Sequence, residues 1–456
     1  MPALSGPLLL LLLLAAILFI IIATARLKIN AFLVLLIAAY ALGLLAGLPG
    51  KDTISAILSG FSGTVGQIGI VIAAGTVIGL VLERCGGALV MGNAITRLIG
   101  PQRAAFAMSV TGAVVSIPVF CDSGFVILSP LARSLARGSR HSPAVFATAL
   151  SMGLYTTHVF VPPTPGPIAA AGELGAGVGM VIVLGLIATI PVVLATYAFA
   201  VHVGSRVQLD TAPLQPVETT AKETAALETA RPGVLWAFLP IIAPVLLIAL
   251  SSVAELPEAP FGTGLIAATI TFFGNPNTAL LLGVALAFIA ARRYGPVVYG
   301  GWVSDALASA GAIILITGAG GALGGVLRAT PAADYLSSTL SAIDFGSFGA
   351  LLPFIIAAAL KTALGSSTVA IITTAPLVAP VLPSIGLGSD IGLALTVLAI
   401  GAGSMTVSHA NDSYFWVVNQ FSGMSVPQAY RLQTLGSAVA GISGILTVLL
   451  LQFLLL

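Results

Sequence analysis

Long apolar runs separated by short polar breaks fill most of the chain. A helix needs about 20 apolar residues to span a membrane, and runs of this length recur from one end of the sequence to the other. We therefore predict an all-α fold of membrane-spanning helices. The predicted helices of the first half lie at about 7–24, 30–48 and 64–82 (helices 1–3), from 143 onward (helix 5) and at 177–201 (helix 6). Those of the second half lie at about 233–253 (helix 7), within 261–290 as a short helix followed by helix 8, at 304–327 (helix 9), after 384 as a broken helix (helix 10) and at 433–455 (helix 11).

Two further apolar regions contain a polar break that prevents a single span. Residues 349–360 and 371–382 are each too short to cross a membrane, and the polar sequence GSST lies between them. Unpaired backbone at membrane depth is tolerated only where protein or a watery cavity surrounds it. We therefore predict a re-entrant hairpin at about 347–384 (hairpin 2) and another at about 104–135 (hairpin 1), which is broken at 116–124.

Prolines and polar residues also interrupt two of the predicted helices. The helix that begins near Pro143 meets PPTPGP at 162–167, and four prolines in six positions cannot continue a helix. The last helix but one is broken near 410–412, where the sequence is AND. Residues 87–99 are only partly apolar, and we predict an interfacial helix there.

A segment without large apolar runs divides the chain. Residues 208–232 are rich in Thr, Ala and Glu. We predict an N-terminal repeat at 1–204 with helices 1–6, a cytoplasmic linker at 205–232, and a C-terminal repeat at 233–456 with helices 7–11.

Composition places the chain among polytopic membrane proteins. Of its 456 residues, 58% are hydrophobic and 7% are charged, whereas a soluble domain has about 25% charged residues. The net charge of +2 lies in loops and does not indicate a nucleic-acid partner. Cys85 and Cys121 lie in or beside apolar segments and suggest neither a disulfide framework nor a metal site, and we expect no cofactor.

The positive charges predict the orientation of the chain. Arg26 and Lys28 follow the first apolar run, as in a first spanning helix and unlike a signal peptide. If the loops after helices 1, 3, 6, 8 and 10 are cytoplasmic, they hold 14 of the 17 Lys and Arg residues, in agreement with the positive-inside rule. The N-terminus is then periplasmic, hairpin 1 enters from the cytoplasm and hairpin 2 enters from the periplasm.

The two halves share a weak internal repeat. Residues 78–85 (IGLVLERC) match 323–330 (LGGVLRAT) at an offset of 245, which also aligns Asp122 with Ser367. Residues 155–158 (YTTH) resemble 406–409 (TVSH), and each is followed by a helix break. Because the charge distribution places equivalent segments on opposite sides, we predict two inverted-topology repeats, which in transporters hold the substrate at the membrane midplane.

Three segments resemble the gluconate permease family of bacterial proton symporters. These segments are YTTHVFVPPTPGP at 155–167, GSSTVA at 365–370 and SHANDSY at 408–414. The resemblance extends over essentially the whole chain and implies inner-membrane uptake of gluconate or a related small hydroxy acid. Some relatives take fructuronate or D-serine. The wider ion-transporter superfamily implies two hairpins, a moving transport domain and a homodimer.

The breaks and tips supply candidate site residues. Hydroxyls of a sugar-like acid need hydrogen-bonding partners, and its carboxylate needs a positive partner, such as Lys361 or the helix N-termini that start at Ser367 and Ser413. The candidate substrate-binding residues are Asp122, Ser123, Thr156, Thr157, His158, Thr164, Ser366, Ser367, Thr368, Asn411 and Asp412. A proton carrier must titrate near neutral pH, as histidine does and as a buried aspartate can, and the candidates are Asp122, His158, His409 and Asp412.

Other interpretations of these residues remain open. Each histidine could be an ordinary core residue, Asp122 could only cap a helix, and Lys361 could extend to the membrane surface. The coupling ion could be sodium, and the substrate could be D-serine or another small amino acid. We do not expect an enzyme, because Ser408 and His409 are adjacent on the chain and adjacent helical residues do not face each other.

Overall fold

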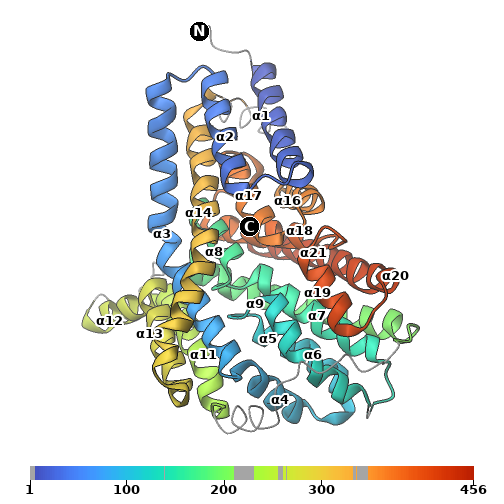
Figure 1. The fold of residues 1–456 in the computed structure, drawn as a ribbon. Coiled ribbons are helices and arrows are strands. Elements are labelled where there is room, and N and C mark those ends of the chain that lie inside the picture. The colour runs from blue at the N-terminus through green and yellow to red at the C-terminus, as the bar shows by residue number, and fades with distance from the viewer. Residues whose placement is uncertain are drawn as a thin grey trace.

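The computed structural model describes residues 6–137, 139–209, 231–254, 260–262, 264–331, 335 and 348–456. The described part of the chain is helical and contains no strand, as predicted (Figure 1). Most of the predicted linker at 205–232 lies outside the described residues, as does most of the weakly apolar segment at 331–343. The all-α polytopic class is therefore confirmed.

The first half of the chain folds into helices close to the predicted ranges. They are α1 (Gly6–Ile21), η1 (Ile22–Arg26), α2 (Ala31–Leu45), α3 (Gly50–Arg84), α4 (Gly87–Ile99), η2 (Pro101–Arg103), α5 (Ala104–Val115), α6 (Cys121–Arg137), α7 (Pro143–Phe160), α8 (Pro165–Leu174), α9 (Val178–Phe199) and η3 (Ala200–Gly204). Hairpin 1 is α5–α6, and the proline-rich segment separates α7 from α8.

The described residues of the second half are also helical. Its helices are α11 (Val234–Ala254), α12 (Leu265–Gly274), α13 (Pro276–Ala290), η4 (Arg292–Val298), α14 (Gly301–Ala329), α16 (Leu351–Leu364), α17 (Ser367–Val378), η6 (Ala379–Val381), η7 (Pro383–Ile385), α18 (Asp390–Met405), α19 (Ser413–Ser422), α20 (Val426–Ala429), η8 (Tyr430–Thr434) and α21 (Leu435–Leu455). Hairpin 2 is α16–α17, and residues 406–412 separate α18 from α19.

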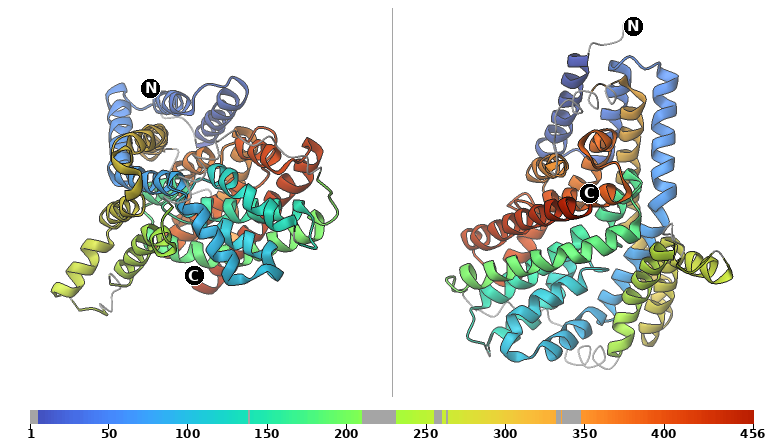
Figure 2. Two further views of the ribbon diagram at one scale, coloured as in Figure 1. Left: turned by 60° about the horizontal axis from the view of Figure 1, so that its bottom comes forward. Right: turned by 180° about the vertical axis from the view of Figure 1, so that it is seen from behind.

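Seven helices in the described residues are long and apolar enough to cross a membrane, and α12 with α13, bent by 66°, could form an eighth span. The predicted range 64–82 for the third helix was too short, because α3 begins at Gly50 and has 35 residues. Its first part carries Ser, Thr and Gly, which do not end a helix when a partner packs against them. That partner is α14, which lies beside α3 in both views (Figures 1 and 2).

Contacts between helices follow the same pattern in the two halves. Helix α5 packs on α7, as α16 packs on α18. The second helix of each hairpin contacts the broken helix of its own half and also that of the other half, so that α6 packs on α7 and α19, and α17 packs on α18 and α8. Figure 1 places hairpin 1 in the lower part of the molecule and hairpin 2 in the upper part, with α9, α18 and α21 between them. Each hairpin is therefore held by both halves of the chain.

Small residues allow these helices to approach closely. A Cβ atom added to Gly153 of α7 would lie 2.1 Å from the carbonyl oxygen of Ser109 in α5. In the second half, a Cβ atom on Gly403 of α18 would lie 2.2 Å from the carbonyl oxygen of Phe354 in α16. Close backbone approach of this kind is typical of helix packing in membranes.

One ion pair connects α8 to the long helix α14. Glu173 of α8, whose side chain is 4% exposed, accepts a hydrogen bond from Arg328 of α14 at 2.9 Å. Thr64 of α3 donates to the other carboxylate oxygen of Glu173 at 3.0 Å. Helix α8 is therefore held against both α3 and α14.

We predict that Gly153→Ala lowers the stability of the protein by about 1–3 kcal/mol, because the added methyl group overpacks the contact between α5 and α7. The control is Gly311→Ala in α14, where an added Cβ has nothing within 4 Å. Thermal unfolding of the purified proteins in detergent measures both effects. Equal unfolding midpoints for Gly153→Ala and the wild type would contradict the packing argument.

Candidate substrate site between the hairpins and the broken helices

The tip of hairpin 2 lies against the break between α18 and α19. Gly365 ends α16 with φ +79°, and a Cβ atom at this position would lie 2.1 Å from the carbonyl oxygen of Asn411. The side chain of Asn411 donates to the carbonyl oxygens of Thr362 and Ala363 at 2.9 and 3.3 Å. These contacts fix the two unwound segments to each other.

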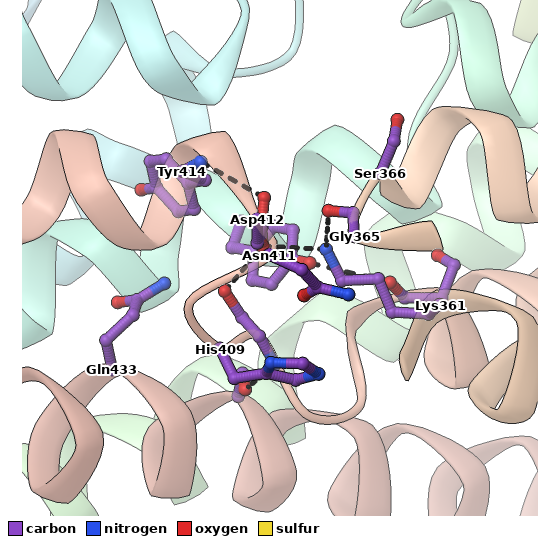
Figure 3. A network of polar contacts seen from close by, with 12 residues as sticks. Lys361, Gly365, Ser366, His409, Asn411, Asp412, Tyr414 and Gln433 are labelled. Atoms are coloured by element: carbon purple, nitrogen blue, oxygen red, sulfur yellow. Dashed lines mark hydrogen bonds and ion pairs between the residues drawn. The ribbon is translucent and has the colours of Figure 1, made fainter. Parts of the chain in front are cut away.

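A buried ion pair joins the same two segments. The Lys361 ammonium in α16 lies 2.6 Å from Oδ2 of Asp412, and the two side chains are 0% and 5% exposed (Figure 3). Lys361 also donates to the carbonyl oxygen of Gly365 at 2.7 Å. Breaking a buried ion pair by removing one partner is strongly destabilising, because it leaves an uncompensated charge in a dry environment.

The Asp412 carboxylate has further partners within the break. The Ser408 hydroxyl donates to Oδ2 at 2.5 Å, and the backbone N–H of Tyr414 donates to Oδ1 at 3.0 Å. The second of these bonds caps the N-terminus of α19, where a carboxylate also interacts favourably with the helix dipole. The Ser408 N–H donates to the Ser437 hydroxyl in α21 at 2.8 Å, and the preceding residue, Val407, has φ +62°, which is rare for a β-branched residue.

Aromatic side chains line the other side of the ion pair. The Lys361 ammonium lies 5.7 Å from the ring centroid of Tyr155 in α7, within the range of a cation–π contact. The ring of Tyr155 lies 5.2 Å from that of Tyr414, which in turn lies 6.4 Å from Phe125 in hairpin 1. The Tyr414 hydroxyl donates to the carbonyl oxygen of Ser151, 2.9 Å away. These rings connect the ion pair to hairpin 1.

Several buried polar atoms in and beside hairpin 1 have no hydrogen-bond partner among the described residues, among them the hydroxyls of Ser109 and Thr111 in α5. Three of these atoms belong to candidate site residues: Oδ1 of Asp122, Oγ1 of Thr157 and Nδ1 of His158. The His158 ring lies 5.9 Å from that of Phe120, which precedes the start of α6. Asp122 and His158 both interact electrostatically with Lys361 and Asp412. Since buried polar groups are normally hydrogen-bonded, these three atoms are available to a polar ligand.

The structure separates the remaining candidates into two groups. Ser367 is buried and in hydrogen-bonding range of Tyr155, while Ser366 caps α17 and Thr368 follows in its first turn. The other residues bond away from the ion pair. Thr156 and Thr164 donate to the carbonyl oxygens of Met152 and Val161, Ser123 lies beside Glu83, and His409 and Asn411 are bonded to the Thr362 carbonyl oxygen.

Two sequence-based interpretations change. Lys361 does not extend to the surface, because it is fully buried against Asp412. The N-terminus of α19 is already occupied by the Asp412 carboxylate, so it is not free to receive a substrate anion. Tyr155, Tyr414 and Ser408 were not among the predicted site residues, although all three lie in the segments that carry the family resemblance.

No group of three or more metal-ligating side chains occurs in the part of the chain that the structure describes. What the site offers is one buried cation, two carboxylates, a histidine and several hydroxyls. Such a set suits a small polar anion, which it can bind through charge and hydrogen bonds.

Known proteins resemble this chain over nearly its full length. The family model for GntP family permeases matches residues 8–454. A gluconate permease of Pseudomonas aeruginosa is 33% identical, with 96% of each chain covered. The D-serine transporter DsdX of Escherichia coli is 30% identical, with 95% of this chain and 96% of the relative covered.

Solved transporter structures share the fold at lower sequence identity. Neisseria gonorrhoeae MtrF, described as one of a class of antimetabolite efflux pumps, superposes with a TM-score of 0.64 at 17% identity over 94% of this chain and 96% of its own. The YdaH transporter of Alcanivorax borkumensis gives 0.61 at 17% identity over 93% and 98%. At this identity the likeness concerns the fold alone.

We predict that Lys361→Met destabilises the protein by about 3–5 kcal/mol, because Asp412 then stays buried without its cation. The double variant Lys361→Met/Asp412→Asn should recover much of this loss, since it removes both charges and keeps an oxygen that can cap α19. Thermal unfolding of the wild type, both single variants and the double variant forms a complete cycle. Additive losses in the double variant would contradict a direct pairing.

Proposed function

The chain belongs to the GntP family of permeases, and we propose that it takes up gluconate or a related small hydroxy-carboxylate together with a proton. The observation that carries this proposal is the buried pair of Lys361 and Asp412 between hairpin 2 and the broken helix. Lys361 is the one Lys or Arg that is fully buried in the described residues. A single buried cation suits a substrate with one carboxylate, because a second carboxylate would stay unpaired in a dry site.

Hydroxyl groups of such a substrate would bind to the polar atoms on the side of hairpin 1. Asp122, Thr157 and His158 each have a buried atom without a partner, which supports their role. Ser366, Ser367 and Thr368 lie at the tip of hairpin 2 on the opposite side. We retain Ser123, Thr156, Thr164 and Asn411 as proposed contacts, although their present bonds point to structural roles.

The proposed proton carriers differ in their surroundings. Asp412 and His158 are buried, and Asp122 is partly buried and interacts electrostatically with Asp412. His409 is bonded to the Thr362 carbonyl oxygen on the more exposed side of the break, so this residue has the weakest support. We propose that the proton is carried at Asp412, with Asp122 and His158 as the alternatives.

The remaining parts of the proposal concern location and assembly. The protein is a multi-pass membrane protein, and we propose the bacterial inner membrane with a periplasmic N-terminus, from the distribution of Lys and Arg. We also propose that residues 1–204 and 233–456 act as two inverted repeats. A homodimer is proposed from the resemblance to the wider superfamily alone.

A narrow crevice lies between α6, α7 and α19. It is lined by Phe125, Ser129, Arg133, Phe421 and Ser422, among others. Phe125 also contacts Tyr414, whose ring lies beside Tyr155 at the ion pair. We propose that an anion leaving the site passes Phe125 toward Arg133.

A second candidate substrate is D-serine or a similar small amino acid. Its carboxylate would use the same cation, and its ammonium group would bind Asp122, whose Oδ1 has no partner among the described residues. A hydroxy acid needs only a hydrogen bond at this position, so the charge of Asp122 separates the two substrates.

We predict that the purified protein in liposomes accumulates labelled gluconate when an inward proton gradient is imposed in sodium-free choline buffer. Ser367→Ala should reduce the initial rate by about tenfold or more, because a lost hydrogen bond to a charged group is worth about 1.5–3 kcal/mol. Ser443→Ala in α21 is the matched control, since its hydroxyl bonds within its own helix. If uptake requires sodium, the coupling ion is sodium and not the proton. Full activity of Ser367→Ala would show that Ser367 is not part of the site.

We predict that Asp122→Asn distinguishes the two substrate classes. If the natural substrate is a hydroxy acid, the variant keeps gluconate uptake, because an amide still forms hydrogen bonds to hydroxyls. If D-serine is transported, unlabelled D-serine no longer inhibits gluconate uptake by the variant, because the ammonium group of D-serine loses its negative partner. Competition assays on the wild type and the variant measure both effects, and unchanged D-serine inhibition in the variant would exclude Asp122 as the ammonium site.

A further inference from the structure

We propose that Lys361 binds the substrate carboxylate and that Asp412 occupies the same ammonium group until it is protonated, so that one monocarboxylate and one proton cross together. This inference rests on the proposed function. It adds the ligand of the carboxylate, the identity of the competing group and the stoichiometry of coupling.

The surroundings of Lys361 leave one contact that a substrate can replace. The ammonium group donates to Oδ2 of Asp412 at 2.6 Å and to the Gly365 carbonyl oxygen at 2.7 Å, and its remaining side faces the Tyr155 ring at 5.7 Å. The Gly365 carbonyl belongs to the fixed tip of hairpin 2, and the Tyr155 ring is packed against Tyr414. Of these three contacts of the ammonium group, only the Asp412 carboxylate carries a charge that protonation removes.

Protonation at Asp412 need not release this side chain from its place. Its Oδ1 accepts a hydrogen bond from the Tyr414 N–H as the cap of α19, and the Ser408 hydroxyl can rotate to accept a hydrogen bond from the protonated carboxyl group instead of donating one. The carboxyl group therefore stays beside Lys361 and can bind it again when the substrate leaves. The break thus contains Asp412, which competes with the substrate for Lys361, and the hydrogen bonds that keep Asp412 in place.

Charge balance then requires that the proton and the anion travel together. In the resting site, one positive and one negative charge form a neutral pair. Suppose that a proton binds Oδ2 of Asp412 and that the substrate carboxylate replaces Asp412 as the partner of the Lys361 ammonium group. The total charge of Lys361, Asp412 and the substrate carboxylate is then still zero. A substrate bound without the proton would leave an extra buried negative charge, which is costly inside a membrane.

Other ionisable groups face this pair from every neighbouring element. They are Asp122 and Cys121 of α6, Tyr155 and His158 of α7, and Tyr414 of α19. None of them bonds directly to Lys361 in the described contacts, whereas Asp412 does. The proposal therefore assigns the exchange to Asp412 and gives these groups no direct part in it.

The test compares accumulation with exchange in liposomes that contain the full chain. Accumulation of labelled gluconate against a gradient needs proton release, whereas exchange of labelled for unlabelled gluconate across the membrane needs only binding and movement of the loaded site. We expect Asp412→Asn to lose accumulation but to keep exchange, with an exchange rate that no longer depends on pH. Asp305→Asn, a carboxylate in an exposed ion pair on α14, should keep both activities.

The Lys361 variants test the other half of the proposal. Lys361→Met should lower exchange by about 30-fold or more, as expected when one partner of a buried charge pair is removed. Because Lys361→Met leaves Asp412 buried without its cation, Lys361→Met/Asp412→Asn is measured beside it, and the double variant should be folded and equally inactive. If the double variant exchanges gluconate as well as Asp412→Asn does, Lys361 is not the carboxylate ligand and the proposal is wrong.

The stoichiometry has a separate measurement. A potassium diffusion potential of about 100 mV should leave the initial rate of wild-type uptake within about twofold, because an electroneutral cycle moves no net charge through the field. A strong dependence on the potential would overturn the one-to-one ratio.

The failure of the inference differs from that of the proposed function. If the wild type accumulates gluconate but Asp412→Asn, shown by thermal unfolding to be folded, neither accumulates nor exchanges it, only the exchange mechanism fails. If the wild type accumulates neither gluconate nor D-serine under a proton gradient, the proposed function fails, and the inference fails with it.

Discussion

The buried contact between Lys361 and Asp412 is the interaction on which the site depends. An unpaired charge buried at this depth would cost several kcal/mol of folding free energy, and each of the two residues neutralises the other. The pair joins hairpin 2 to the break between α18 and α19, two segments whose unwound backbone needs partners inside a membrane. The same contact thus contributes to the stability of the irregular structure and places a cation where an anionic substrate can use it.

Close helix packing brings this contact into the middle of the protein. Gly153 and Gly403 allow each hairpin to lie directly on the broken helix of its own half. The second helix of each hairpin then contacts the broken helix of the other half, which brings the two tips toward one site. A lipid environment offers little hydrophobic gain for pairing helices, so this arrangement depends on small residues and on polar contacts.

The two halves of the site differ although their helices follow the same plan. On the side of hairpin 2, Lys361, Ser408 and Asp412 satisfy one another. On the side of hairpin 1, Asp122, Thr157 and His158 retain unpaired buried atoms. One side therefore holds a compensated charge, and the other holds buried polar atoms without a partner. The proposed binding of a substrate with a carboxylate at one end rests on this asymmetry.

The sequence by itself determined the helical membrane class, most helix ranges, both hairpins and both broken helices. These features are local, because apolar length, prolines and polar tips act on the residues beside them. The internal repeat also pointed to the segments in which we propose the site. The sequence did not determine the role of Lys361, which could equally have extended to the surface, nor the contribution of Ser408 and Tyr155. Lys361 and Asp412 are separated by 51 positions, and only the packing of α16 against α18 decides that they meet.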